Sequence, residues 1–240
     1  MSKQPLGYYY RTRSQITGTP IVLIFTGFQK KSRNSKTGNL IQSWILDERE
    51  EPHLAIRTGG DASVCGDCAL RPIVGGACYV VTHEAPLAVY RAYMRGSYEP
   101  LQLDDLSAFH GRKARIGSYG DPYAVHARFW TEFLKKAQLA NATGYTHAWR
   151  KPNAWRYRDF LMASVDSPAE QRDAFLRGWS TFRARRETEK VFAYEQICPA
   201  SPEGGEKAKC ETCMACKGAR DKIRHRVIVY HGVRARNGGR

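Results

Sequence analysis

The seven cysteines of the chain fall into two groups, and the spacing of one group is typical of a metal-binding motif. Cys198, Cys210, Cys213 and Cys216, the C-terminal cysteine group, form the pattern C-P-x10-C-x2-C-x2-C. Three thiols this close together cannot pair with one another without strain. A C-x2-C-x2-C run with a remote Cys-Pro is how bacterial-type ferredoxin segments hold a [4Fe–4S] cluster. Four thiolates also bind zinc, so the spacing favours an iron–sulfur cluster and leaves zinc as the alternative.

The N-terminal cysteine group has three members. Cys65, Cys68 and Cys78 form the pattern C-x2-C-x9-C, flanked by paired glycines that let the backbone fold tightly. Three protein ligands leave one coordination position open, which is typical of a reactive metal rather than a structural one. Three nearby side chains are able to close that position: Asp61, Asp67 and His83.

A different arrangement joins the two cysteine groups. Cys65 and Cys68 are able to combine with Cys213 and Cys216 in a zinc-ribbon-like site that clamps the two ends of the chain. The spacing does not separate one shared site from two independent ones. The role predicted for the C-terminal cysteine group is mainly structural, because it ties the polar segment 201–209 to the rest of the domain.

Strands and helices alternate along the part of the chain that follows residue 112. Strands are expected at 112–122, 142–150, 160–166, 180–185, 191–197 and 225–232. Helices are expected at 85–96, 123–140 and 167–179. Ser167 before Pro168 is a predicted helix N-cap. This alternation predicts parallel βαβ units, and hence an α/β protein with an incomplete or open parallel (βα) barrel-like core.

The first part of the chain has a different pattern. Residues 20–28 and 40–46 are rich in β-branched and aromatic side chains and enclose a polar, basic loop, which predicts a β-hairpin. We therefore expect an N-terminal β-hairpin extension over residues 1–53. Residues 54–240 are expected to form the α/β core, which carries two cysteine-rich metal-binding segments, one of them C-terminal.

Polar side chains follow the predicted parallel strands, at the end of such sheets where ligands gather. Tyr119 and Asp121 follow the first of these strands, His147 the second and Asp166 the third; we call these four residues the strand-end rim. We predict that they are catalytic. Asp121 and Asp166 would hold hydroxyls or amines of a substrate or cofactor, and His147 would donate a proton or support a metal ligand.

Other residues are expected to complete this site. Arg115 or Arg183 would bind a carboxylate or phosphate of a cofactor or substrate, and His231 ends the last predicted strand. If the N-terminal cysteine group holds its own reactive metal, it must face the strand-end rim, because metal and substrate-positioning groups share one cleft.

The charge of the chain indicates a polyanionic partner. It has 38 Lys and Arg against 23 Asp and Glu, a formal net charge of +15, and nucleic acid is the simplest match. No apolar stretch approaches the roughly 18 residues of a membrane span, and no signal-peptide pattern opens the sequence. We expect a cytoplasmic protein without membrane contact, in a reducing compartment that favours metal binding over disulfides. Signature motifs of serine hydrolases, zinc proteases and P-loop proteins are absent.

Several segments together resemble a group of phage- and plasmid-encoded proteins. They are GGDASVCGDC…GACYV, RIGSYGDP, TGYTHAWR and ICPAS…CETCMACKG, and the resemblance covers the chain from about Leu54 onward. More loosely, three thiols before a run of βα units are similar to the radical S-adenosylmethionine enzymes. That superfamily spaces its cysteines C-x3-C-x2-C, whereas this chain has C-x2-C-x9-C. The resemblance implies a [4Fe–4S] cluster with one free iron, and S-adenosylmethionine as a further cofactor.

Two functions follow as hypotheses. The first is a metal-centre protein of a mobile element, with iron–sulfur or zinc, that acts on nucleic acid as a radical-type enzyme. The alternative is a non-enzymatic, zinc-stabilised nucleic-acid-binding module. In that alternative, aromatic side chains next to basic ones would stack unpaired bases. The aromatic candidates are Tyr8, Tyr9, Tyr10, Trp149, Trp155 and Tyr157.

Overall fold

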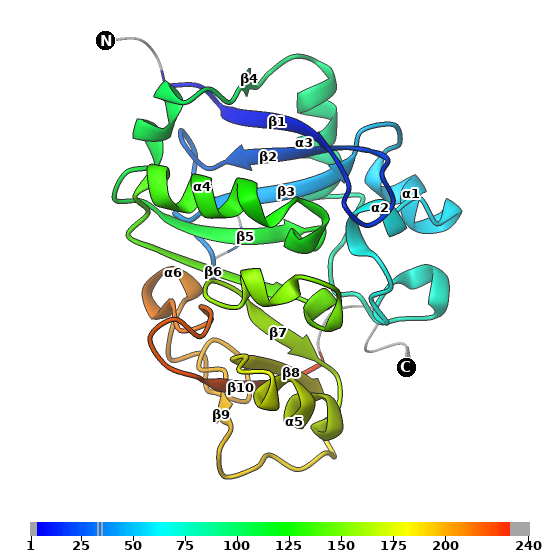
Figure 1. The fold of residues 1–240 in the computed structure, drawn as a ribbon, viewed down its shortest axis with the longest axis vertical. Coiled ribbons are helices and arrows are strands. Elements are labelled where there is room, and N and C mark those ends of the chain that lie inside the picture. The colour runs from blue at the N-terminus through cyan, green and yellow to red at the C-terminus, as the bar shows by residue number, and fades with distance from the viewer. Residues whose placement is uncertain (1–3, 33, 35, 231–240) are drawn as a thin grey trace.

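The computed structural model describes residues 4–32, 34 and 36–230, and its centre is one ten-stranded sheet (Figure 1). The strand order is β4-β1-β2-β3-β5-β6-β7-β8-β10-β9. The strands are β1 (Gly7–Arg13), β2 (Pro20–Thr26), β3 (Ile41–Asp47), β4 (Glu99–Pro100), β5 (Lys113–Tyr119), β6 (Asn141–Thr146), β7 (Met162–Val165), β8 (Thr181–Arg185), β9 (Gln196–Ile197) and β10 (His225–Val229). The predicted α/β class is confirmed. Within the described chain the order is linear, so the sheet is open, with β4 and β9 at its edges.

The sheet changes direction at β3. β1, β2 and β3 pair antiparallel, whereas every pair from β3 to β9 is parallel. The hairpin predicted from residues 20–28 and 40–46 is present as the β2–β3 pair. β3 also pairs with β5, so β1, β2 and β3 belong to the main sheet and are not an appended hairpin. All seven residues of β3 are buried, so this strand is covered on both faces, as expected inside an α/β sheet.

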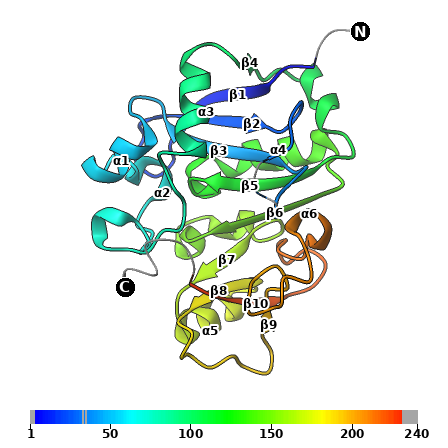
Figure 2. The ribbon, with the colours of Figure 1, turned by 180° about the vertical axis from the view of Figure 1, so that it is seen from behind.

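Helices cover both faces of the sheet. They are α1 (Pro52–Thr58), α2 (Ala62–Cys65), α3 (Ala85–Met94), α4 (Ala127–Ala137), α5 (Pro168–Leu176) and α6 (Cys210–Cys213). Short 3-10 turns are η1 (Pro72–Val74), η2 (Asp104–Phe109), η3 (Pro122–Ala124), η4 (Ala148–Arg150) and η5 (Ala154–Tyr157). α4 lies in front of the sheet in Figure 1 and α3 lies in front of it in Figure 2, so these two helices cover opposite faces.

The ends of α4 and α5 are set by local side-chain chemistry. α4 is shorter than the predicted 123–140, because His126 Nδ1 caps it by accepting from the Arg128 amide at 3.2 Å and Gln138 ends it with a φ of 45°. The Ser167 hydroxyl accepts from the Glu170 amide at 3.2 Å, so the predicted N-cap of α5 is confirmed. The buried residues of α4 recur at helical spacing: Ala127, Trp130, Phe133 and Ala137.

An aromatic cluster holds α4 against the sheet. Phe25 stacks on Phe133 with ring centroids 4.7 Å apart, and Phe109 meets both rings edge-on at 5.3 and 5.1 Å. Such pairs each contribute about 0.5–1.5 kcal/mol beyond the area they bury. Trp130 Nε1 donates to the Pro122 carbonyl at 2.9 Å. The cluster therefore also fixes the turn that follows β5, where the polar residues of the strand-end rim begin.

Arg183 in β8 has a structural role. Its Nε and Nη2 donate to the Glu195 carboxylate at 2.7 and 2.8 Å, and Nη2 also donates to the Lys190 carbonyl. Both charged side chains are 0% exposed. Burial favours the protonated form of Glu195, but the hydrogen bonds from Arg183 outweigh this and lower the pKa of Glu195. The expectation that Arg183 binds a cofactor anion is therefore wrong, because Glu195 already balances its charge.

We predict that Glu195→Ala lowers the free energy of unfolding by about 3–5 kcal/mol, because it leaves the Arg183 charge buried without a partner. Urea denaturation followed by circular dichroism measures the loss. Glu132→Ala is the matched control, since Glu132 pairs with Arg128 on the exposed surface of α4 and should cost less than about 0.5 kcal/mol. Equal losses in the two variants would contradict the structural role of the buried pair.

Candidate active site at the carboxyl ends of the strands

The N-terminal cysteine group lies on the connection that follows β3, beyond the carboxyl ends of the parallel strands, near α2 in Figures 1 and 2. Arg71 organises this loop. Its Nε and Nη2 donate to the buried Asp61 carboxylate at 2.9 and 2.5 Å, Nη1 donates to the Gly66 carbonyl at 2.8 Å, and Nη2 donates to the Gly59 carbonyl at 3.2 Å. Four charge-assisted hydrogen bonds from one guanidinium fix the backbone on both sides of Cys65.

The three half-buried thiols lie in one region, near the buried Tyr119. The Cys68 amide donates to the Cys65 carbonyl at 3.2 Å, and the Cys78 amide donates to the Leu70 carbonyl at 2.9 Å, which brings Cys78 back to the pair. Cys65 interacts electrostatically with Cys68 and Cys78, and Tyr119 interacts with Cys65 and Cys78. Burial raises the pKa of the Cys65 thiol well above its ordinary value and that of Cys68 to about 12.

An irregularity in β5 directs the end of this strand toward the cysteines. The pairing register between β3 and β5 shifts within the segment R-I-G-S-Y-G-D-P. Gly117 and Gly120 adopt φ values of 72° and 78°, which other residues rarely adopt. A Cβ atom on Gly120 would lie 2.5 Å from the Ile45 carbonyl oxygen. The two glycines are therefore required for the bulge that presents Tyr119 and Asp121 at the strand-end rim.

Asp121 links three segments of the chain. Its amide donates to the Val64 carbonyl in the cysteine loop at 2.6 Å. Its carboxylate accepts from the Thr146 hydroxyl at 2.7 Å, the His147 amide at 2.8 Å and the Tyr123 amide at 2.9 Å. Burial raises the pKa of Asp121, although these hydrogen bonds oppose the rise. Because both oxygens are occupied by the protein, Asp121 positions its neighbours and is not free to hold substrate hydroxyls as predicted.

His147 and Asp166 face each other at the ends of β6 and β7. His147 Nε2 lies 3.9 Å from Asp166 Oδ2, and the Tyr230 hydroxyl donates to Asp166 Oδ1 at 3.3 Å. Burial raises the pKa of Asp166. Cys68 interacts electrostatically with Asp166, so the N-terminal cysteine group and the strand-end rim are neighbours. Among the described residues, neither His147 Nε2 nor Tyr119 Oη has a hydrogen-bond partner, and both atoms are buried.

None of the three side chains considered for the open ligand position is free to take it. Asp61 is committed to Arg71, and Asp67 is 69% exposed and pairs with Lys151 at 2.7 Å. His83 lines a separate hollow of about 540 Å³ with His53. Within the described part of the chain, no three His, Cys, Asp or Glu side chains are already arranged to hold a metal ion. The thiols are neighbours, but they do not converge on one point.

The two cysteine groups lie at opposite ends of the strands. In both Figure 1 and Figure 2, α2 and α6 lie beyond opposite ends of the strands. α2 ends at Cys65, and α6 contains Cys210 and Cys213. A single site that joins the two groups is therefore not present in the structure.

Arg115 does not lie at the strand-end rim. It interacts with Cys210, and its Nη2 donates to the Tyr79 hydroxyl at 2.7 Å. His231 lies outside the described residues.

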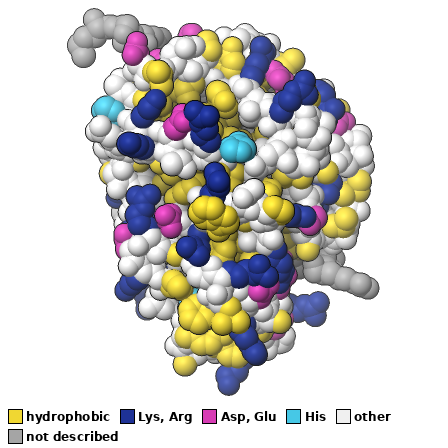
Figure 3. Space-filling model, viewed as in Figure 1, with side chains coloured by type: hydrophobic (Ala, Val, Ile, Leu, Met, Phe, Trp, Pro, Cys, Tyr) yellow, Lys and Arg dark blue, Asp and Glu magenta, His cyan; other side chains and the backbone are white. Residues whose placement is uncertain are grey.

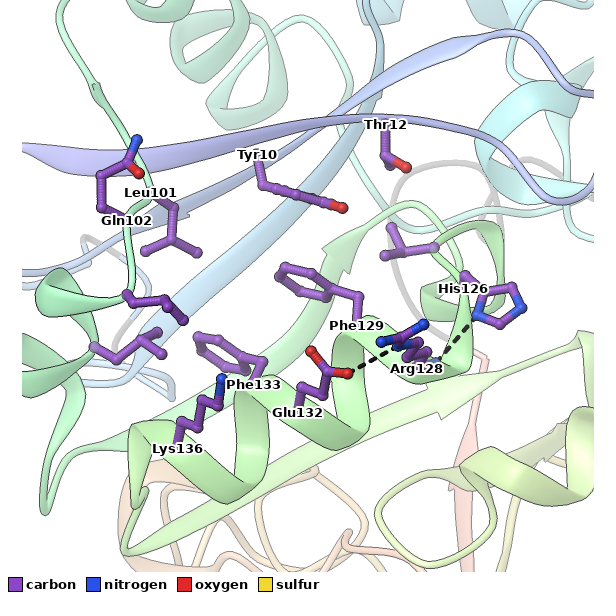
Figure 4. A pocket seen from close by; sticks show the side chains of 13 residues that line it. Tyr10, Thr12, Leu101, Gln102, His126, Arg128, Phe129, Glu132, Phe133 and Lys136 are labelled. Carbon is purple, nitrogen blue, oxygen red and sulfur yellow. Dashed lines mark hydrogen bonds and ion pairs between the residues drawn. The ribbon is translucent and has the colours of Figure 1, made fainter.

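A groove of about 450 Å³ lies away from these residues, between β1, the chain before η2, and α4 (Figure 4). Tyr10 stacks on Phe129 there with ring centroids 4.5 Å apart. Arg128 pairs with Glu132 at 2.9 Å on the α4 side of the groove, and Lys136 lies one turn further along. Apart from Tyr10, a candidate for base stacking, the groove contains none of the predicted site residues, and we assign no chemistry to it.

Basic side chains are spread over the face shown in Figure 3, interspersed with apolar ones. Of the aromatic residues considered for base stacking, Tyr8, Trp149 and Tyr157 are buried in the core. Trp155 in η5 is 61% exposed, and the Arg156 guanidinium lies 5.2 Å from its ring centroid. This pair stands on the connection between β6 and β7, which directly follows the strand-end rim.

Sequence analysis missed several residues of the site. Arg71 is the only basic residue between Cys65 and Cys78, and this was an available signal. Thr146 precedes His147 and carries no motif of its own. Tyr230 reaches Asp166 only because β10 pairs beside β8, which local sequence does not reveal.

Comparison of the chain with protein-family models, with curated proteins and with solved structures finds no match. No helix among the described residues is both long enough and apolar enough to cross a membrane. The residues of the site and their surroundings are thus the basis on which a function is inferred.

We predict that Gly120→Ala destabilises the protein by about 1–3 kcal/mol more than Gly18→Ala does. Both glycines have similar positive φ values, 78° and 75°, so the conformational cost of alanine is shared. Gly18 has no atom within 4 Å of an added Cβ, whereas Gly120 meets the Ile45 backbone. Thermal denaturation of the two variants measures the difference. Equal losses would show that the β5 bulge does not depend on close packing at Gly120.

Proposed function

We propose that this protein is a metal-dependent enzyme that acts on nucleic acid, with its reactive metal bound by Cys65, Cys68 and Cys78. One observation carries the proposal. Tyr119, which interacts with Cys65 and Cys78, and His147, which lies beside Asp166, each carry a buried polar atom (Oη and Nε2) without a hydrogen-bond partner in the described chain. A buried polar group without a partner costs about 1–3 kcal/mol, and active sites are where such a cost is retained.

The donor set fits a thiophilic metal. Thiolates select zinc and iron–sulfur clusters among the common metals, and three of them leave one position open. The side chains must rotate to converge on the metal, and the short turn from Cys65 to Cys68 allows this because Gly66 separates them. A cluster or zinc ion at this place would offer its open position to a substrate group or to S-adenosylmethionine.

The residues around the thiols have separate roles in the proposal. Asp121 fixes the position of the His147 backbone relative to the cysteine loop, because it hydrogen-bonds to both. His147 moves a proton to or from the substrate at Nε2, and Asp166 Oδ2 lies 3.9 Å from this nitrogen. Tyr119 donates its hydroxyl hydrogen to a polar substrate atom. Arg71 positions the cysteine loop and does not contact substrate.

The net charge of +15 supports nucleic acid as the substrate class. Lys151 and Trp155 stand on the connection after β6, and Lys151 also pairs with Asp67 in the cysteine loop. An exposed aromatic ring with a guanidinium beside it binds an unpaired base by stacking. The non-enzymatic alternative is weaker, because it relied on clusters of stacking residues of which Tyr8, Trp149 and Tyr157 are buried.

We predict that Cys78→Ser removes the metal of the N-terminal cysteine group while the fold remains. The metal content per chain should fall by the amount that one centre binds. Inductively coupled plasma mass spectrometry after anaerobic purification measures it. The absorption spectrum distinguishes iron–sulfur from zinc. Full metal content in Cys78→Ser, or no metal in the wild-type protein, would refute the proposed centre.

The catalytic role has its own test. Nucleosides from the nucleic acid of cells that express the wild-type protein are compared by mass spectrometry with those from cells that express Cys78→Ser or His147→Asn. We expect an altered nucleoside or altered strand ends in cells that express the wild-type protein. We expect neither change in cells that express either variant. Identical nucleic acid from all three would contradict enzymatic action on this substrate class.

Binding to single-stranded oligonucleotides tests the stacking residue. Trp155→Ala should weaken binding by about 1–3 kcal/mol, roughly 5- to 150-fold in Kd. Tyr194→Ala is the control, because Tyr194 is exposed to a similar degree but lies far along the chain, beside Phe192 and His225. The affinity of the wild-type protein should fall steeply with salt. Affinity that is independent of salt would exclude nucleic acid as the partner.

A further inference from the structure

The C-terminal cysteine group lies in a long segment that has almost no regular structure. Between β9 and β10 the chain runs through residues 198–224, and its only helix, α6, has four residues. Few apolar side chains of this segment are buried; Ala200 and Met214 are the main ones. Loops longer than about 12–15 residues without secondary structure are uncommon in compact domains. Something other than a hydrophobic core must therefore hold this segment.

Backbone contacts bring the four cysteines to one place. The Cys198 amide donates to the Val227 carbonyl at 2.9 Å, and the Cys216 carbonyl accepts from the Gly144 amide at 3.2 Å. These contacts attach the first and last cysteine to β10 and β6. Cys210 interacts electrostatically with Cys198 and Cys213, and Cys216 interacts with Cys198 and Cys210. The group is thus a cluster in space as well as a pattern in sequence.

Close backbone approach surrounds the cluster. A Cβ atom on Gly204 would lie 2.2 Å from the Cys198 carbonyl oxygen, and one on Gly218 would lie 2.3 Å from the Arg158 carbonyl oxygen. The Lys113 ammonium donates to the Glu211 carbonyl at 3.0 Å. The cysteine-bearing segment is therefore packed against the domain on several sides, and the positions of its thiols are defined.

Two arginine side chains lie beside the cluster. Arg115 interacts with Cys210, Arg226 interacts with Cys216, and the Tyr145 hydroxyl hydrogen-bonds to the Cys216 sulfur. The Nε atoms of Arg115 and Arg226 are buried and have no hydrogen-bond partner among the described residues. The groups that act on Arg115 are tyrosines and a cysteine, not carboxylates. Arg71 in the N-terminal loop differs, because Asp61 neutralises it.

We infer that Cys198, Cys210, Cys213 and Cys216 bind a second, structural metal centre whose negative charge is balanced by Arg115 and Arg226. Four thiolates around one zinc dication, or around a doubly positive [4Fe–4S] cluster, sum to two negative charges. Two half-buried guanidinium groups, whose Nε atoms are buried and have no hydrogen-bond partner among the described residues, match this charge. A buried donor without an acceptor is costly, so these atoms indicate that an anionic group belongs here. This centre does not depend on the proposed function of the N-terminal cysteine group.

The side chains of the four cysteines must rotate to reach ligand distances, since in the described chain they do not converge. α6 is a single turn, and Met214 ends it with a φ of 47°, so the turn between Cys213 and Cys216 is tight. Four protein ligands leave no open position, which is typical of a structural site. Metal binding would then fasten residues 198–224 to β6 and β10, and its free energy would add directly to folding.

Metal counting tests the second centre. The wild-type protein, Cys213→Ser and the double variant Cys65→Ser/Cys68→Ser are purified anaerobically, and metal per chain is measured for each. We expect each variant to lose the share of one centre and to keep the other. If Cys213→Ser keeps the full wild-type content, the second centre is refuted while the N-terminal centre stands. Loss only in Cys213→Ser would refute the N-terminal centre and leave the second one.

A charge variant tests the role of the arginines. Arg115→Met should weaken metal binding by about 10- to 100-fold in a competition titration with a chelator, and Arg115→Lys should restore part of it. Arg128→Met on the exposed face of α4 is the control and should have no effect. In parallel, a chelator should expose Lys207 and Lys209 to trypsin in the wild-type protein. Unchanged affinity in Arg115→Met, together with unchanged proteolysis, would overturn the inference.

Discussion

The arrangement of the candidate site depends on the hydrogen bonds of Asp121. This residue joins the cysteine loop, the end of β5 and the end of β6 through Val64, Thr146 and His147. Hydrogen bonds to a charged group contribute about 1.5–3 kcal/mol each, and here they offset part of the cost of burying a carboxylate. The bulge at Gly117 and Gly120 places Asp121 where it contacts Val64, Thr146 and His147. Other residues of the strand-end rim take their positions from it.

The two cysteine groups have similar chemistry and different electrostatic surroundings. Near the N-terminal group, Arg71 is neutralised by Asp61, and the remaining neighbours are the acidic side chains Asp121 and Asp166. Near the C-terminal group, Arg115 and Arg226 supply positive charge without a carboxylate. Positive surroundings stabilise thiolates in a closed, anionic site. Polar groups with unused hydrogen-bonding capacity suit a site at which a substrate enters.

The sheet also explains why the C-terminal segment needs to be fastened. A parallel sheet must be covered on both faces, and helices usually do this. α3 and α4 cover the half of the sheet around β3 and β5 (Figures 1 and 2). Around β8 and β10, much of the chain is irregular, and β9 has only two residues. In our proposal, a metal that cross-links the four cysteines would supply there what helix packing supplies in the other half.

The sequence by itself determined most of the parallel strands, the longer helices and the grouping of the reactive residues. Strand and helix periodicity located β5 to β8, β10, α3, α4 and α5, since each of these segments buries one side or both. Because the carboxyl ends of parallel strands lie at the same edge of a sheet, the sequence predicted that His147 and Asp166 lie close together. The spacing of Cys210, Cys213 and Cys216 defined one cluster from local sequence alone.

Only the tertiary structure decided which face and which end each residue occupies. Arg115 and Arg183 lie in similar strands, yet Arg115 faces the C-terminal cysteine group and Arg183 pairs with Glu195 on the other side. Alternation along a strand separates two faces but does not say which of them points toward a site. The membership of β3 in the main sheet and the separation of the two cysteine groups depend on strand order. Strand order is set by long-range pairing, which no local pattern records.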